Sequence, residues 1–118
     1  MNIEIINKGS YDVLKIIGAI KMGESKDIFV RSLKKELDKK AHCLMIDFSE
    51  VNYIDSNGIG ELVGYLEKFK ELGSQLILLQ PQKRIRDLLQ ITRLNTIFPI
   101  FLSEEEAVKE LNLPETTE

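Results

Sequence analysis

The sequence predicts one α/β domain: a mixed, mostly parallel β-sheet with an antiparallel N-terminal strand and about four helices. Three observations lead to this prediction. The 118-residue chain is 43% hydrophobic and 30% charged, which is typical of a single globular domain. Its apolar segments alternate between the periods of a strand and of a helix. After the first two strands, helical segments separate the strands, so right-handed crossovers should connect parallel neighbours.

The first half of the chain predicts a hairpin, a helix and a central strand. Two short β-branched segments begin at Ile3 and Tyr11, and residues 7–10 between them have the composition of a hairpin turn. Across residues 25–40, apolar side chains recur every three or four positions, as in an amphipathic helix. The nearly continuous apolar run CLMIDF, beginning at Cys43, is expected in the middle of the sheet.

The next segment predicts a strand–helix–strand unit. Apolar side chains repeat at helical spacing from Ile59 to Leu72, and Gly73 is a suitable helix stop. The run QLILL follows as another buried strand. A further helix is predicted over residues 81–91, which begin with a proline and carry apolar residues on one face.

The last elements are a short strand and a short helix. The run TIFPIF contains Pro99, which cannot donate to a ladder, so this strand belongs at an edge of the sheet. Ser103 and Glu106 have the spacing of a capping box for the final helix. We expect residues 1–113 to form the domain and residues 114–118 to form a polar C-terminal tail.

Composition argues against several classes of function. The net charge is −3 with both signs spread along the chain, so no direct nucleic-acid binding is predicted. No segment approaches the roughly 18 apolar residues of a membrane span, and no leader pattern is present, so we expect a cytoplasmic protein without membrane insertion. Cys43 is alone in an apolar run and is expected to be a buried thiol. No cofactor and no metal are predicted.

An enzymatic function is not predicted either. His42 is the only histidine, and the sequence offers no matched nucleophile for it. Neither the Walker spacing nor the G-x-G-x-x-G fingerprint is present. A phosphoaspartate receiver could use Asp47 or Asp55, but such a domain needs acids after its first strand, and the run IEIINKG supplies none there. We therefore expect the two aspartates to end a strand and to cap a turn.

The segment YIDSNGIGELVGY, residues 53–65, joins a strand to a helix and carries an unusual density of polar and small residues. In the simplest interpretation Ser56 caps the helix, while Asp55 and Asn57 shape a tight turn. Glycine in a helix costs about 1 kcal/mol relative to alanine, so three glycines here suggest that something closely approaches the backbone. These are Gly58, Gly60 and Gly64. The approaching group could belong to the sheet or to another protein.

The run DSNGIG, with the later Gly64 and Gly73, resembles the signature of bacterial anti-sigma factor antagonists, the single-domain STAS proteins. The resemblance extends over essentially the whole chain. MIDFSEVNYIDSNGIG is similar to the family's strand, short loop and phosphoacceptor turn. PQKRIRDLLQITRLNTIFPIF is similar to its third helix and last strand, and SEEEAVKEL to its closing helix. The resemblance therefore implies a STAS-like fold.

The resemblance also implies a function. In this family the serine directly after the aspartate is phosphorylated by an anti-sigma serine kinase, a GHKL-type ATPase, and a PP2C-type phosphatase removes the phosphate. The corresponding residue is Ser56, and the unphosphorylated form would bind the kinase and free the sigma factor. The expected partner contacts form a recognition turn and two positions four residues apart on the helix, which we expect to be exposed. They are Asp55, Asn57, Gly58, Glu61 and Tyr65.

The sequence departs from the family pattern in two places. Asn57 stands where the family often has serine or threonine, which leaves Ser56 as the one hydroxyl of the turn. Ala19 and Lys21 stand where many antagonists have acids. The alternative function is a STAS subunit of another assembly, in lipid transport or in chemosensory or diguanylate signalling, with no sigma factor.

Overall fold

The computed structural model describes residues 1–113; the predicted tail, residues 114–118, lies outside this range. The elements follow one another in the predicted order. The strands are β1 (Asn2–Asn7), β2 (Asp12–Ile20), β3 (Cys43–Ile54), β4 (Gln75–Leu79) and β5 (Ile100–Phe101). The helices are α1 (Glu24–Asp38), α2 (Ser56–Glu71), α3 (Lys83–Ile91) and α4 (Glu104–Glu110), with a 3-10 turn at Leu94–Thr96.

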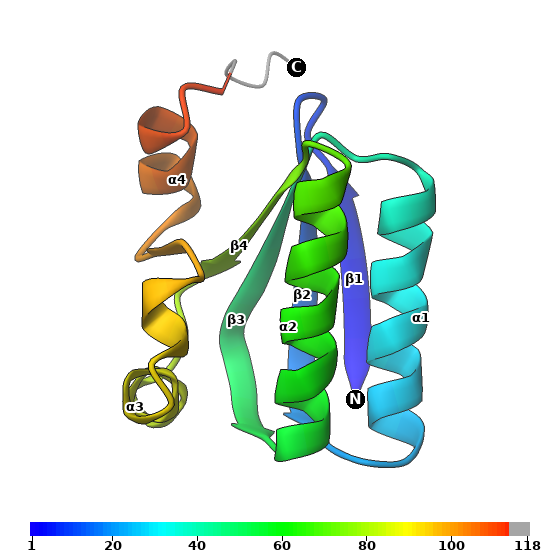
Figure 1. Ribbon diagram of the computed structural model, residues 1–118, viewed down its shortest axis with the longest axis vertical. Coiled ribbons are helices and arrows are strands. Elements are labelled where there is room, and N and C mark those ends of the chain that lie inside the picture. The colour runs from blue at the N-terminus through cyan, green and yellow to red at the C-terminus, as the bar shows by residue number, and fades with distance from the viewer. Residues whose placement is uncertain (114–118) are drawn as a thin grey trace.

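The strands form one five-stranded sheet in the order β1-β2-β3-β4-β5 (Figure 1). β1 pairs with β2 in the antiparallel sense, and every later pairing is parallel. The predicted mixed, mostly parallel sheet with an antiparallel N-terminal strand is therefore confirmed. In the predicted hairpin turn, the side chain of Asn7 accepts a hydrogen bond from the backbone of Gly9 at 2.8 Å, and Gly9 has a positive φ of 91°.

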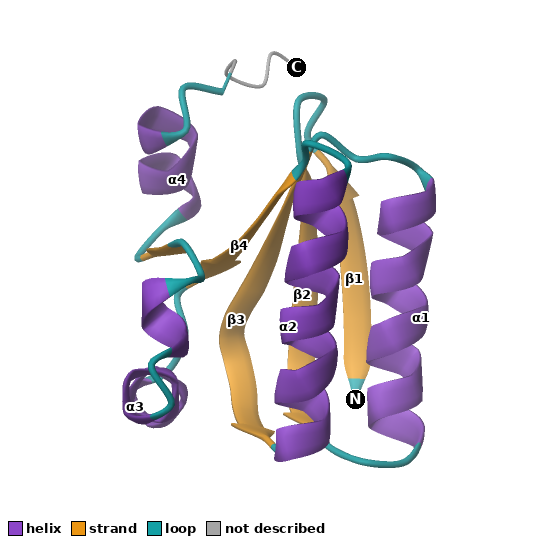
Figure 2. Ribbon diagram, viewed as in Figure 1, coloured by secondary structure: helices purple, strands orange, loops and turns teal. Residues whose placement is uncertain are grey.

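The helices cover the two faces of the sheet unequally. α1, α2 and α3 pack over the larger apolar cluster on one face, while α4 covers a smaller cluster on the other. Figure 2 shows α1 and α2 side by side in front of the sheet. The smaller cluster contains Cys43, which is fully buried as predicted. Alternate side chains of the central strands therefore enter different clusters, as the period of a strand requires. The sheet presents its larger apolar face to the helix that follows β3.

The central strand β3 is longer than its apolar run. It pairs with β4 only between Cys43 and Asp47, whereas its pairing with β2 continues to Ile54. The expectations that a loop follows CLMIDF and that Asp47 ends the strand are therefore wrong, because backbone pairing with β2 continues through the polar residues. This extension carries the chain past the end of β4 before α2 begins, and so places the start of α2 at one end of the molecule.

The C-terminal elements agree with the predicted signals but are short. β5 has two residues and lies at the edge of the sheet, as its neighbouring proline requires. The carbonyl of Pro99 accepts a hydrogen bond from the backbone of Leu78 at 2.9 Å. Ser103 is the N-cap of α4, and its hydroxyl accepts a hydrogen bond from the backbone of Glu106 at 3.0 Å, as the predicted cap requires.

Candidate phosphorylation and docking site

Asp55 fixes the turn between β3 and α2. It is the N-cap of α2, and its Oδ1 accepts a hydrogen bond from the backbone N–H of Gly58 at 2.9 Å. Its Oδ2 accepts a second hydrogen bond, at 2.8 Å, from the backbone N–H of Met22 in the loop before α1. Its own N–H donates to the carbonyl of Ile20 at 3.0 Å. One side chain therefore fastens two loops to each other, and the expected turn-capping role of Asp55 is confirmed.

These hydrogen bonds also set the charge of the turn. The N–H of Gly58, and then that of Met22, stabilise the carboxylate and hold the pKa of Asp55 below its usual range. Asp55 is therefore ionised at neutral pH. A negative charge at the start of a helix is also stabilised by the helix dipole.

Ser56 does not cap the helix. The simplest interpretation of the sequence is wrong on this point, because the carboxylate of Asp55 already accepts from the first turn and Ser56 is the first helical residue. Its side chain is exposed, and within residues 1–113 its hydroxyl makes no hydrogen bond. A hydroxyl in this position is accessible to a modifying enzyme.

The three glycines of α2 have different environments. A Cβ on Gly58 would lie 2.8 Å from Cγ1 of Ile54 and 2.9 Å from Cγ2 of Ile20, so here the sheet itself approaches the backbone. A Cβ on Gly60 or Gly64 would meet nothing within 4 Å in the described part of the chain. The close approach inferred from the sequence is therefore internal at Gly58, while Gly60 and Gly64 leave bare backbone on the outer side of α2.

The remaining predicted contact residues differ in exposure. Asn57 is half-buried, and Glu61 is half-exposed with a carboxylate oxygen 3.9 Å from the ammonium of Lys26. The expectation that Tyr65 is exposed is wrong: only 5% of this residue is accessible. Its ring belongs to the larger apolar cluster, and the ammonium of Lys68 lies 4.5 Å above the ring centre. Tyr65 therefore stabilises α2 by packing in the core.

Sequence reasoning missed two apolar residues beside this turn. Met22, whose N–H binds Asp55, is 69% exposed, and Tyr53, two residues before Asp55, is 46% exposed. Tyr53 is in the part of β3 that extends beyond β4 and points away from the face that buries Ile54. Strand alternation through Ile54 could have revealed Tyr53. Together Met22 and Tyr53 give the turn an apolar border.

The other titratable candidates do not assemble into a reaction centre. His42 lies just before β3, whereas Asp55 follows its far end. Asp47 and Asp55 are eight residues apart along one strand, which corresponds to roughly 25 Å. Asp47 instead accepts a hydrogen bond from the backbone of Ser49 at 2.9 Å. Among residues 1–113, no group of three metal-binding side chains is found.

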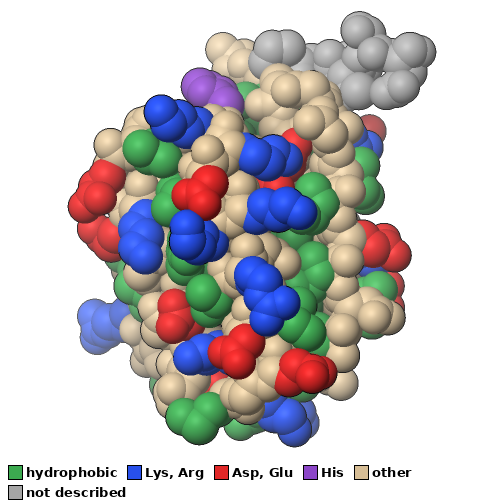
Figure 3. All heavy atoms as spheres, turned by 90° about the vertical axis from the view of Figure 1, so that its right-hand side faces the viewer, with side chains coloured by type: hydrophobic (Ala, Val, Ile, Leu, Met, Phe, Trp, Pro, Cys, Tyr) green, Lys and Arg blue, Asp and Glu red, His purple; other side chains and the backbone are tan. Residues whose placement is uncertain are grey.

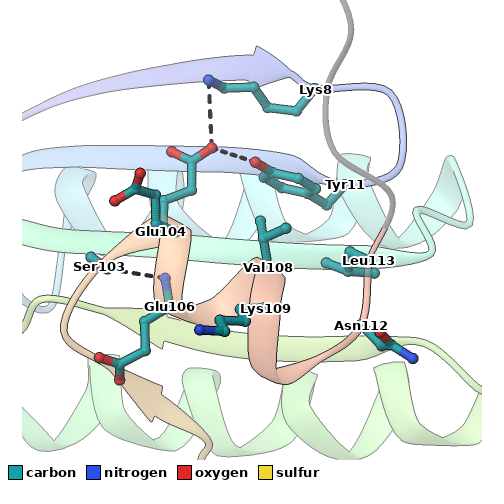
Figure 4. Close-up of a pocket in the computed structure, with 10 residues that line it drawn as sticks. Lys8, Tyr11, Ser103, Glu104, Glu106, Val108, Lys109, Asn112 and Leu113 are labelled. Carbon is teal, nitrogen blue, oxygen red and sulfur yellow. Dashed lines mark hydrogen bonds and ion pairs between the residues drawn. The ribbon is translucent and has the colours of Figure 1, made fainter.

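An open hollow lies between the β1–β2 hairpin and α4 (Figure 4). There the ammonium of Lys8 lies 3.4 Å from Oε2 of Glu104, and the hydroxyl of Tyr11 donates a hydrogen bond to the same oxygen. These contacts tie the start of α4 to the hairpin. The hollow is separate from the turn at Asp55, and its polar contacts serve to hold α4 on the sheet.

Comparison with known proteins identifies related sequences. A family model described as the STAS domain matches residues 2–107. The anti-sigma-B factor antagonist of Listeria monocytogenes is 37% identical over 62 residues, which are 52% of this chain and 54% of that protein. The chain thus spans about half the length of the curated relatives it matches.

Solved structures show the same fold. An anti-sigma factor antagonist from Mycobacterium paratuberculosis superposes with a TM-score of 0.80 at 19% identity, covering 94% of this chain and 93% of that one. The Bacillus cell fate determinant SpoIIAA, in its phosphorylated form, superposes with a TM-score of 0.69 at 19% identity, covering 93% and 97%. At these identities the likeness establishes the arrangement of strands and helices.

Proposed function

Because the chain belongs to the STAS domain family, we propose that it is an anti-sigma factor antagonist. Its unphosphorylated form binds an anti-sigma serine kinase and so frees a sigma factor, and phosphorylation of Ser56 ends the binding. The observation that carries this proposal is the exposed hydroxyl of Ser56, which has no hydrogen-bond partner within residues 1–113 and is held on a turn fixed by Asp55. Similarity to the Listeria antagonist supports the same function.

The docking surface of this proposal surrounds Ser56. Asp55 and Asn57 form its polar centre, and Met22 and Tyr53 supply exposed apolar area beside it. Methionine and aromatic side chains are enriched in protein interfaces relative to the rest of the surface. Gly58 contributes to this surface indirectly, because its lack of a side chain lets the first turn of α2 lie close to the sheet. Glu61 lies at the border of this surface, one turn further along α2.

Phosphorylation changes this surface without requiring a new fold. A phosphate adds about −1.5 to −2 units of charge at a position that the partner covers. The dipole at the start of α2 stabilises the phosphate by roughly 0.3 to 1 kcal/mol. In the complex, however, the phosphate is desolvated beside the ionised Asp55. A hundredfold loss of affinity requires only about 2.7 kcal/mol.

The proposed partners follow from the family. The kinase is a GHKL-type ATPase that also binds the sigma factor, and a PP2C-type phosphatase regenerates the active form. In this proposal the protein acts in the cytoplasm, is not an enzyme and does not bind nucleic acid directly. On the face shown in Figure 3, basic and acidic side chains are interspersed rather than gathered by sign. No helix within residues 1–113 has the length and apolar character needed to cross a bilayer.

The first test is the modification itself. Incubation with the cognate kinase and ATP is expected to add one phosphate, which peptide mapping should place on Ser56. Ser49, Ser74 and Thr92 are alternative acceptors in the same chain. Phosphate found only on one of those residues would remove Ser56 from the proposal.

The second test measures the switch by calorimetric titration against the purified kinase. Ser56→Ala should bind like the unmodified protein, because it removes only an exposed hydroxyl that does not cap the helix. Ser56→Asp should bind at least tenfold more weakly, because it adds negative charge beside Asp55. Asn95→Asp, which adds the same charge on the exposed 3-10 turn, is the matched control and should bind normally. Equal affinities for the two Ser56 variants would instead favour a STAS subunit of another assembly.

A further inference from the structure

Two carboxylates and one lysine meet where the end of α1 packs against the start of β2. The ammonium of Lys39 lies 2.8 Å from Oδ2 of Asp12 and 3.1 Å from Oε2 of Glu36. Asp12 is the first residue of β2, and Glu36 is in the last turn of α1. This trio is at the opposite end of α1 from the loop that binds Asp55.

The environment of Glu36 does not suit a full negative charge. Glu36 is completely inaccessible to solvent, and Asp12 is 5% exposed. Oε1 of Glu36 is the one buried side-chain polar atom within residues 1–113 that lacks a hydrogen-bond partner. If both acids were ionised, a single lysine would face two buried negative charges. A buried charge without full compensation is expensive, and a carboxyl group usually avoids it by taking up a proton.

We propose that Asp12 and Glu36 hold one proton between them in weakly acidic solution and lose it near neutral pH, so that below neutral pH the domain takes up a proton at this pair when it folds. The proton resides on Oε1 of Glu36, where it converts an unpartnered acceptor into a donor. The carboxylate of Asp12 accepts that hydrogen bond and also accepts one from Lys39. Every buried polar group of the trio is then satisfied, and one positive charge faces one negative charge.

The direction of each pKa shift supports this arrangement. Burial, and then the hydrogen bond with Asp12, raise the pKa of Glu36 to about 7. Burial opposes ionisation of Asp12, but the hydrogen bonds from Glu36 and Lys39 outweigh it and hold the pKa of Asp12 below its usual range. The hydrogen bond to Asp12 raises the pKa of Lys39, so the lysine stays charged. The charged groups acting on Glu36 are Asp12 of β2 and Lys39 at the end of its own helix.

The sign of the effect follows from linkage. The folded pKa of Glu36 lies above the unfolded one, so between these values the folded state binds more protons than the unfolded state. Stability therefore falls as pH rises from about 5 to about 7, and the loss is complete above the folded pKa. Asp12 has a lowered pKa, so its contribution is lost only in acid, outside this range.

The experiment measures the unfolding equilibrium in urea from pH 5 to pH 9. For the wild-type protein, the unfolding constant should rise by up to about tenfold per pH unit between pH 5 and 7, the limit for one linked proton. Glu36→Gln, which has nearly the same shape and keeps a donor for Asp12, should lose this dependence. Asp38→Asn, an exposed acid two residues away whose partner is Lys34, should keep it. The same pH dependence in wild type and Glu36→Gln would overturn the proposal.

A direct titration keeps the proposal testable if Glu36→Gln does not fold. In wild-type protein carrying 13C-labelled glutamate, the Glu36 carboxyl resonance should titrate with a midpoint near pH 7. Asp12→Asn serves to assign the pair, because removing the acceptor should move the Glu36 midpoint. A Glu36 midpoint near the ordinary value of 4.5 in the wild type would show that the pair holds no proton just below neutral pH.

Discussion

At the scale of single residues, Asp55 and Gly58 determine how Ser56 is presented. The carboxylate of Asp55 accepts hydrogen bonds from Gly58 within the helix and from Met22 outside it. Gly58 has no side chain, and so the first turn of α2 can lie against Ile20 and Ile54. Because these contacts leave the neighbouring Ser56 exposed, the turn combines a fixed backbone with a free hydroxyl.

Gly58→Ala should destabilise the domain by about 1 to 3 kcal/mol, the usual effect of an extra methyl group in a packed core. The new Cβ would lie under 3 Å from branched side chains whose positions are fixed by the sheet. Urea unfolding measures the change. Gly64→Ala is the control, since it adds the same methyl group to the same helix in open space. Equal stability of the two variants would contradict the crowding at Gly58.

Asp55→Ala should lose about 0.5 to 2 kcal/mol of stability together with both hydrogen bonds. Asp55→Asn should separate the two roles, because its remaining oxygen can accept from Gly58 while its amide nitrogen cannot accept from Met22. Amide hydrogen exchange measures both contacts. Protection of Met22 should fall in both variants, and protection of Gly58 only in Asp55→Ala. Unchanged protection of Met22 in Asp55→Asn would show that the side chain does not join the two loops.

At the scale of elements, α2 has two distinct faces. Its inner face packs Leu62, Tyr65, Leu66 and Phe69 into the larger apolar cluster. On the outer face, Gly60 and Gly64 follow Ser56 at intervals of one turn and leave the backbone bare. Such a surface lets a partner approach the helix axis directly beside the proposed phosphorylation site.

Gly60→Ala and Gly64→Ala should each stabilise the domain by about 0.5 to 1 kcal/mol, because both sites are open and alanine favours the helix. If the kinase covers this face, the same substitutions should weaken its binding. Urea unfolding and calorimetric titration measure the two effects separately. Raised stability with unchanged affinity would place the interface closer to Met22 and Tyr53 than to the outer face of α2.

Most elements could be predicted because they depend on local patterns. The helical spacing from Ile59 to Leu72 and the cap at Ser103 each depend on residues that are only a few positions apart in the sequence. The four-residue spacing between Glu61 and Tyr65 could not predict that Tyr65 is buried, because Glu61 lies at the edge of the inner face whereas Tyr65 lies within it. Its spacing from Leu62, Leu66 and Phe69 fits the inner face.

Other features depend on contacts between distant segments. β3 extends to Ile54 because it pairs with β2, whereas the apolar run that predicts the strand is interrupted after CLMIDF by polar residues. The hydrogen bond between Asp55 and Met22 joins positions 33 residues apart. The spacing of Glu36 from Phe29 and Leu33 fits the buried face of α1, but the sequence does not show that this face brings Glu36 to Asp12 of β2.

At the scale of the whole molecule, the proposed phosphorylation adds charge at one end of a domain formed by the sheet and its helices. The start of α2 lies at the end where β3 extends past β4, and the two apolar clusters lie behind it. A phosphate on Ser56 therefore touches neither cluster. The proposed switch acts on the surface that a partner meets.

Phosphorylation of Ser56 should change the unfolding free energy by no more than about 1 kcal/mol, the scale of a helix-dipole interaction. The reason is that Ser56 is exposed and does not cap α2. Urea unfolding of modified and unmodified protein measures the difference, and circular dichroism checks that the helices persist. A change above about 3 kcal/mol would show that the phosphate reaches the core and acts through the fold.

The two side-chain hydrogen bonds of Asp55 have a kinetic consequence. A turn that is already ordered has little conformational entropy left to lose when a partner arrives. Association should then be a single docking step, with a rate constant on the order of 10⁵ to 10⁷ M⁻¹s⁻¹ and no slower rearrangement after the encounter. A negative charge at Ser56 should therefore act mainly by shortening the lifetime of the complex, so that the duration of the bound state carries the signal.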